Sequence, residues 1–445
     1  MEEKKEGDEI LQPTTTTKNK LKLDIVVPSL RCQAVALERF LKLKIPRNLL
    51  WNDFAVRVAL DTDRPENIRC VKDLKRKYPH LHIVERRRRE FPSGASATRN
   101  DGARDSLADW ILFLDDDVSP RDNLLQVYAE MILKLSKQND INGFVGLTDF
   151  HVPKTLFGLA VKSQGMISPF VVAREKRFPM WAPTSNLVLR RNQVRFDETL
   201  PKSGGSEDVE LCARIYEKND RRACLVSVPS AVVSHDLWRP SATMRRAFRW
   251  GASSVDLQMR HPNFTSRSYP DTIETILIYF MIWVFVSIFF YTSITLSWWW
   301  FTFVIGIVLT ALHDVVIWIT RIMSHMRFNQ YSLVPSTEDG LIHPKIIGIR
   351  ASDLTQVSKS DGGCVFYLCL VGVAILATII DTTFLIGRLY SIFTKSKGWK
   401  CFFRNFDFTF CTEKRLPICL AFKDVVVRMF LIPTVCIVLG VHVSS

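Results

Sequence analysis

The sequence predicts an α/β fold, with an open and mostly parallel sheet, followed by C-terminal transmembrane helices. Short strand patterns alternate with helical patterns from residue 21 onward, which is the element order of such a sheet. The charge is also uneven. Residues 1–270 carry 45 basic and 34 acidic side chains, whereas residues 271–445 carry 14 and 11 and contain long uncharged runs. The polar N-terminal part and the apolar C-terminal part of the chain indicate a soluble domain joined to a membrane anchor.

The composition excludes several classes of protein. An apolar share of 47% over 445 residues supplies a core and excludes a disordered chain. The counts of Gly, Pro and Cys are ordinary, which excludes collagen and small disulfide scaffolds. Residues 1–20 are polar and lack the apolar stretch of a signal peptide, so we expect a disordered tail and a cytosolic front domain. The predicted domains are 1–20 (tail), 21–238 (α/β domain), 239–272 (interfacial helix) and 273–445 (membrane domain).

Apolar runs and helical spacing give the elements of the front domain in order. The predicted strands are Leu23–Pro28, Phe54–Leu60, His82–Val84, Trp110–Leu114 and Leu225–Val233. The predicted helices are Ala34–Leu43, Ile68–Tyr78, Ala95–Leu107, Asn123–Lys137, Glu207–Lys218 and Arg239–Arg260. In open α/β sheets, ligands bind outside the carboxyl ends of the strands. Two acidic clusters follow strands there, Asp61 with Asp63, and Asp115–Asp117.

The back of the chain contains a long uncharged run, Thr275–Leu312. One helix over these 38 residues would be about 57 Å long, nearly twice a bilayer core, so two spans with a turn near Tyr291–Ser297 fit better. Buried soluble helices are the alternative. The four predicted hydrophobic segments are about 274–292, 297–319, 364–387 and 425–443.

The orientation of these segments is ambiguous. With four spans, loop 388–423 would lie outside, yet it carries eight Lys and Arg against five in loop 321–362. Cytosolic loops usually hold the larger number. Either 364–387 forms a re-entrant or interfacial hairpin, or charges in the middle of the chain count for less.

Carboxylates form two groups with chemical potential. Asp115 and Asp117 lie on one side if the strand continues, and hard oxygen ligands there suit Mg²⁺ or Mn²⁺. A solvated acidic turn is the alternative. Glu207 and Asp208 open a predicted helix, where acids either complement the helix dipole or take a proton from a bound hydroxyl.

Basic and aromatic residues form a third group. Arg246, Arg249 and Trp250 share one helical face, which suits a diphosphate and a stacked sugar, or alternatively a basic helix at a membrane surface. His235, at a strand end, fits a metal ligand or a structural histidine. The four arginines at 86–89 would fit nucleic acid, but a surface near an anionic donor or lipid headgroups agrees better with the acidic clusters and the apolar segments.

Five motifs in order resemble the family 2 glycosyltransferases over roughly residues 20–252. They are the IVVP strand with the LDTD strand end; Arg99-Asn100 opening a helix; the strand running into Asp115-Asp116-Asp117; Phe196-Asp197 followed by Glu207-Asp208; and Arg246-Ala-Phe-Arg249-Trp250, a variant of the (Q/R)xxRW motif. The resemblance implies a GT-A fold and a nucleotide-sugar donor.

The resemblance also implies roles for residues. It places Asp208, beside Glu207, as the general base of an inverting transfer and Trp250 at the acceptor. It gives Asp117, with Asp115 beside it, as metal ligands, and His235 is a further candidate ligand from its position near a strand end. It gives the following donor-binding residues: Pro28, Asp61 (or Asp63), Arg99, Asp115, Asp116, Asn186, Arg246 and Arg249.

These expectations combine into a multi-pass membrane glycosyltransferase with a cytosolic catalytic domain and a Mg²⁺ or Mn²⁺ cofactor. It would move a sugar, from a UDP-sugar, to a lipid or glycan acceptor at the membrane, without nucleic acid as a partner. A processive polysaccharide synthase and a single-sugar transferase both remain open. The alternative from another class is an inactive glycosyltransferase-like membrane protein with a binding or scaffolding role.

Overall fold

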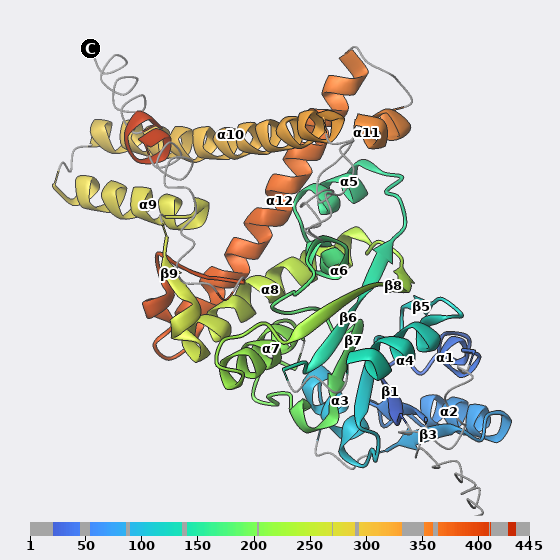
Figure 1. Cartoon of the computed structure of the whole chain (residues 1–445). Coiled ribbons are helices and arrows are strands. Elements are labelled where there is room, and N and C mark those ends of the chain that lie inside the picture. Colours follow the sequence, from blue (N-terminus) through green and yellow to red (C-terminus); the bar gives the residue numbers. More distant parts are fainter. Residues whose placement is uncertain are drawn as a thin grey trace, which may run out of the picture.

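An eight-stranded sheet in the order β3-β2-β1-β4-β7-β6-β8-β5 forms the N-terminal domain of the computed structural model (Figure 1). The structure describes residues 21–44, 54–85, 90–135, 140–202, 204–268, 270–289, 293–331, 351–358, 364–408, 410 and 426–432. The predicted tail 1–20 and the arginines at 86–89 lie outside these residues. The predicted α/β class is confirmed.

The first half of the sheet is parallel, as predicted. Its strands are β1 (Leu23–Ser29), β2 (Val56–Leu60), β3 (Leu81–Val84) and β4 (Trp110–Leu114). The associated helices are α1 (Ala34–Leu41), α2 (Pro65–Lys77), α3 (Ala95–Arg104) and α4 (Leu124–Leu135). Helices cover both faces, which explains why these strands are continuous apolar runs instead of alternating patterns.

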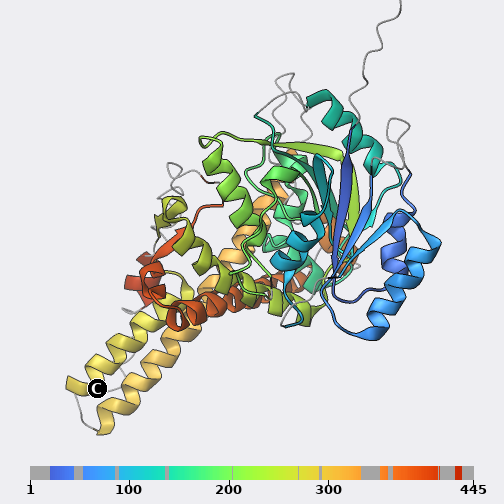
Figure 2. The ribbon, with the colours of Figure 1, turned by 90° about the horizontal axis from the view of Figure 1, so that it is seen from below.

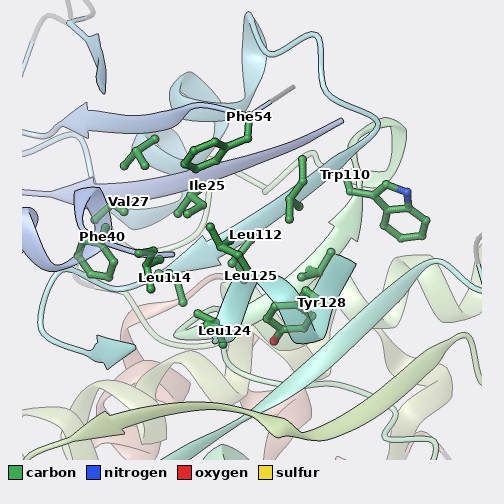
Figure 3. Packing of buried hydrophobic residues seen from close by; sticks show 14 of the residues in the cluster. Ile25, Val27, Phe40, Phe54, Trp110, Leu112, Leu114, Leu124, Leu125 and Tyr128 are labelled. Carbon is green, nitrogen blue, oxygen red and sulfur yellow. The ribbon is translucent and has the colours of Figure 1, made fainter. Parts of the chain in front are cut away.

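One hydrophobic core holds this half together (Figure 3). Ile25 of β1 and Leu112 of β4 meet Phe40 of α1 and Tyr128 of α4, and all four side chains are buried. The core fixes the strand ends, and therefore the loops that follow them.

The second half of the sheet is mixed, because β7 (Asn186–Arg190) runs antiparallel to both of its neighbours, β4 and β6 (Gly143–Phe150). β8 (Leu225–His235) is parallel to β6 and pairs with the short β5 (Ser119–Pro120). Neither β6 nor β7 was predicted from the sequence. Their register places Asn186 beside Leu114 and His235 beside Phe150, at the edge where the acids of β4 follow.

Helices α5 (Leu156–Ser163), α6 (Val172–Glu175) and α7 (Glu207–Lys218) complete the domain. Helix α8 (Pro240–Arg260) leads out of it to α9 (Thr272–Phe289), α10 (Ser293–Tyr331), α11 (Ala351–Ser358) and α12 (Cys364–Thr394). A small hairpin of β9 (Thr265–Arg267) and β10 (Arg404–Phe406) closes this region. Figure 2 shows α9 and α10 projecting side by side away from the sheet.

Two helices of the described chain are long and apolar enough to cross a membrane, Trp300–Ser324 and Cys364–Thr394. A third span is possible if the bent pair Leu156–Ser163 and Ser168–Glu175 counts as one, and Thr272–Phe285 is a shorter apolar helix. The second and third predicted segments therefore correspond to candidate spans, whereas the first is shorter than a span.

Two details differ from the sequence-based picture of the membrane region. Helix α12 is one continuous helix, so the predicted alternative of a hairpin at 364–387 is wrong. Helix α10 continues to Tyr331 beyond the predicted end at 319. The predicted segment 425–443 lies outside the described residues except for 426–432.

Candidate active site

The three acids after β4 differ in their main partners. Asp115 accepts a hydrogen bond from Arg99 Nη2 at 3.0 Å, and Asp116 accepts from Arg31 Nη2 at 2.6 Å. Asp117 lies 3.3 Å from His235 Nε2 and accepts from the same Arg31 Nη2 at 3.4 Å. The strand ends at Leu114, so the alternation expected for a continuing strand does not extend to these residues.

Asp117 and His235 form the part of this cluster that suits a metal. Burial opposes ionisation of Asp117, but the His235 hydrogen bond and the neighbouring Arg31 and Arg246 lower its pKa to about 2. Burial also disfavours the charged imidazole, yet the bond to Asp117 raises the pKa of His235. A carboxylate and an imidazole fit a divalent cation that takes its other ligands from substrate phosphates. No group of three or more metal-binding side chains meets within the described chain, because Asp115 is paired with Arg99.

Arg99 connects the two predicted acidic clusters. Its side chain, only 7% exposed, donates to Asp115 through Nη2 and to Glu207 Oε1 through Nη1, each at 3.0 Å. Nη1 also lies 3.8 Å from Asp208 Oδ1. Burial alone would lower the pKa of Arg99, but the three surrounding carboxylates stabilise the charged guanidinium and raise that pKa.

The loop before α7 turns Glu207 and Asp208 toward this arginine. Gly204, Gly205 and Ser206 have φ angles of 77°, 104° and 83°, a left-handed run that favours glycine. Glu207 Oε2 accepts from the Gly205 amide at 2.6 Å, which fixes its carboxylate. The Gly-Gly-Ser sequence therefore bends the chain sharply at the point where α7 begins.

Asp208 is held by Thr184, which donates from its hydroxyl at 3.0 Å and from its amide at 3.2 Å. Burial, and then the charge of Glu207, raise the pKa of Asp208 to about 7, although Arg99 acts in the opposite direction. A carboxylate with a pKa near neutrality can accept a proton from a bound hydroxyl under working conditions.

The basic motif on α8 borders the cluster. The Arg246 guanidinium lies 4.1 Å from the ring centre of Trp238 and 5.9 Å from that of Trp250. Burial lowers the pKa of Arg246, while Asp115 and Asp117 raise it, which places its charge near the acids. Arg249 is half-buried on the same helix, and burial lowers its pKa as well.

Several predicted donor residues have structural partners in this fold. Asp61 Oδ1 accepts from Ser93, and Oδ2 accepts from the Gly94 amide at 3.1 Å, so Asp61 holds the loop that leads into α3 and Arg99. Asp63 is exposed beyond the end of β2, and Pro28 is half-buried near the end of β1. A donor role of these three residues stays a prediction.

Asn186 is placed differently from its prediction as a donor contact. Its amide donates to the carbonyls of Leu147 and Ala231, and its oxygen accepts from Tyr128 at 2.7 Å. The side chain is buried among strands, where these bonds join β6, β7 and β8. In this structure, Asn186 therefore stabilises the sheet.

Sequence reasoning missed three residues of the site, namely Ser29, whose hydroxyl donates to Asp116 at 2.8 Å, Arg31 and Trp238. Arg31 and Ser29 follow or end β1, so the rule about carboxyl strand ends could have found them. Trp238 carries no local signal. Thr184 lies in a segment that resembles the lining of the donor-sugar pocket in the family, but its pairing with Asp208 was not predicted. A cavity lined by Lys22, Asp24, Arg57, His80 and His82 lies at the opposite edge of these strands, and none of the predicted site residues lines it.

Acids and arginines are grouped at the carboxyl edge of this sheet, which is where open α/β sheets bind their ligands. Residues 24–147 match the family described as Glycosyl transferase family 2. The pre-mycofactocin glycosyltransferase of Mycobacterium tuberculosis is 30% identical over 183 residues, which cover 39% of this chain. The match spans 37% of that curated relative, little more than a third of its length.

Solved structures give lower similarity. The mannosyltransferase PcManGT from Pyrobaculum calidifontis, in complex with GDP-Man and Mn²⁺, is 14% identical over 55% of this chain and 65% of its own, with a TM-score of 0.40. S. aureus TarS 1-349 in complex with UDP-GlcNAc is 15% identical over 55% of this chain and 70% of its own, with a TM-score of 0.35.

Proposed function

We propose that the chain is an inverting, metal-dependent hexosyltransferase that moves a sugar from a UDP-sugar to a lipid or glycan acceptor at the membrane. The observation that carries this proposal is the single cluster in which Arg99 joins the acids after β4 to Glu207 and Asp208. The match of residues 24–147 to the model of Glycosyl transferase family 2 supports the reaction class.

Asp208 acts as the general base. With its pKa near 7, it removes the proton from an acceptor hydroxyl as that oxygen attacks the anomeric carbon. The bonds from Thr184 keep its carboxylate in one orientation, and Arg99 stabilises the ionised form. Attack opposite to the leaving diphosphate inverts the anomeric centre.

The donor diphosphate lies beside the acids after β4. Asp117 and His235 would hold a Mg²⁺ or Mn²⁺ ion, which stabilises negative charge on the leaving diphosphate when it is bound. Arg31, Arg246 and Arg249 are the cations of this chain that can contact diphosphate oxygens at that edge. The acceptor enters from the side of Trp250.

Exposed apolar side chains on the C-terminal helices support the membrane placement. Leu312 is 55% exposed and Leu368 65%, on the two candidate spans, and Phe285 is 61% exposed on the shorter apolar helix α9. We place the protein as a multi-pass membrane protein with its catalytic domain in the cytosol, where nucleotide sugars are available to it.

A panel of radiolabelled nucleotide sugars tests the function, with purified full-length protein in lipid vesicles and sizing of the product. A labelled glycan or glycolipid from one donor is expected. A short product would mean single-sugar transfer, and a long polymer a processive synthase. Nucleotide binding without any product from the panel would favour the inactive, scaffolding alternative.

A further inference from the structure

We propose that α12, a candidate membrane span, positions the catalytic loop, which is loop 204–206 immediately before Glu207 and Asp208. It would do so through a close crossing with α8, at which one glycine of each helix lies against the backbone of the other. This inference rests on the proposed function, because it concerns the same site. It assigns Gly251 and Gly387 as positioning residues for Asp208, although neither lies among the acids.

The two helices touch backbone to backbone at this crossing. A methyl group on Gly251 would collide with the carbonyl oxygen of Phe384, and one on Gly387 would collide with the carbonyl oxygen of Phe248. Two reciprocal glycines allow two helix axes to approach more closely than side chains normally permit. The crossing is therefore set by backbone atoms, which cannot move aside as a side chain can.

Further contacts keep the same register along both helices. Thr383 donates to the Met244 sulfur, Phe248 packs on Tyr390 with ring centres 5.6 Å apart, and Lys395 pairs with Asp256. These contacts lie on both sides of the glycines. Helix α8 therefore packs against α12 over several turns.

Near the C-terminal end of α12, the buried side chain of Arg388, next to Gly387, holds the helix in place. Its Nη1 donates to Asp271 and to Glu274 Oε1, the latter at 2.9 Å. Its Nη2 donates to the carbonyls of Cys401 and Arg404, each at 2.8 Å. To break these four bonds, α12 would have to move apart from the start of α9 and from the β9–β10 hairpin, so the position of α12 is well fixed.

From the crossing, two contacts lead to the catalytic loop. A methyl group on Gly205 would lie 2.9 Å from Trp250 Cδ1, so the indole packs directly on this glycine. The Ser206 hydroxyl donates to the Ser253 hydroxyl at 2.7 Å. Trp250 and Ser253 flank Gly251, whereas Gly205 and Ser206 immediately precede Glu207 and Asp208. A displacement of α8 would thus move the loop that carries the general base.

The test is an alanine at either glycine in the full-length protein, measured in lipid vesicles. Gly387→Ala and Gly251→Ala are expected to lower kcat for transfer at least tenfold and to raise the Kd for UDP clearly less, because Arg246 and Arg249 shift with α8 whereas β1 to β4 do not touch this crossing. Gly372→Ala is the matched control. It lies on the same helix, and its new methyl would meet only Leu156 Cδ1, at an ordinary 3.6 Å.

Arg388→Lys provides a second variant that adds no bulk to the crossing. It keeps the charge but cannot reach both acids and both carbonyls, and a similar selective loss of kcat is expected. Wild-type turnover in the alanine variants, or a loss of UDP binding as large as the loss of turnover, would overturn the coupling. Failure of the proposed function is distinguishable, because then the wild-type protein itself transfers no sugar.

Discussion

At the scale of single residues, the carboxylate of Asp208 is oriented by Thr184 but only partly compensated by Arg99, which lies 3.8 Å away. Asp208→Asn keeps the size of the side chain: its amide oxygen can accept from the Thr184 amide, and its nitrogen can donate to the Thr184 hydroxyl, but the amide cannot take a proton from the acceptor. We expect turnover to fall by about 10²- to 10⁴-fold, with UDP binding nearly unchanged. Steady-state kinetics and UDP titration measure the two effects, with Asp73→Asn on exposed α2 as the control. Unchanged turnover would remove Asp208 as the base.

The pKa of Asp208 gives a pH dependence of defined sign. A base must be ionised to act, so kcat/KM for the acceptor should rise tenfold per pH unit below about pH 7 and level off above it. A profile from pH 5 to pH 9 measures this limb. A flat profile over that range would mean that no group with this pKa takes the proton.

The proposed metal site at Asp117 and His235 predicts how the protein responds to removal of divalent cations. Chelation with EDTA should abolish transfer, and Mn²⁺ or Mg²⁺ should restore it. Asp117→Asn should raise the metal concentration needed for half-maximal activity at least tenfold. Asp122→Asn, a few residues beyond and 76% exposed, should leave it unchanged. Full activity in EDTA would contradict the metal assignment.

At the scale of elements, the face of α8 that carries Arg246 and Trp250 offers a test of the acceptor side. Trp250→Ala removes the indole that packs on Gly205, next to Glu207 and Asp208. We expect transfer to the acceptor to fall at least tenfold, while the slower hydrolysis of the donor changes less. Parallel assays of transferred and released sugar give the ratio. Equal losses in both reactions would instead fit a helix that serves only membrane attachment.

The sequence predicted the elements whose signal is local. Trp110–Leu114 is apolar throughout because helices cover both faces of β4, and that run can be recognised without its partners. The strand Asn186–Arg190 was missed because its first residue is polar. Asn186 becomes a sheet residue only through Tyr128, Leu147 and Ala231, which lie 39 to 58 positions away.

The same distinction applies to the site. Asp115, Glu207 and Asp208 were predicted from motifs, and the structure brings them together. The connection through Arg99 was not predictable from spacing, since Glu207 lies 108 positions further along the chain. Arg31 was missed although its place after a strand end could have marked it as a candidate, because only the acidic side chains at these strand ends were considered.

At the scale of the whole molecule, the exposed apolar faces of the C-terminal helices predict a response to charge. Ile379 is 45% exposed near the middle of α12. Ile379→Lys should cost about 3 kcal/mol of membrane insertion and reduce the fraction that resists alkaline carbonate extraction. Leu107→Lys, at an 86% exposed site of the α/β domain, is the control. Equal extraction of both variants would argue against α12 as a span.

The register between α8 and α12 also has a consequence for how the protein is made. Gly251 and its partner Phe384 are separated by more than a hundred residues that include α9 and α10. The strands of the α/β sheet are all synthesised once β8 is complete, although Phe264, Phe406 and Phe410 join its core later. The contact between α8 and α12 is expected to form last, because long-range contacts form late when a chain emerges in order. The loop before Glu207 and Asp208 is thus expected to reach its final position only after α12 has been placed.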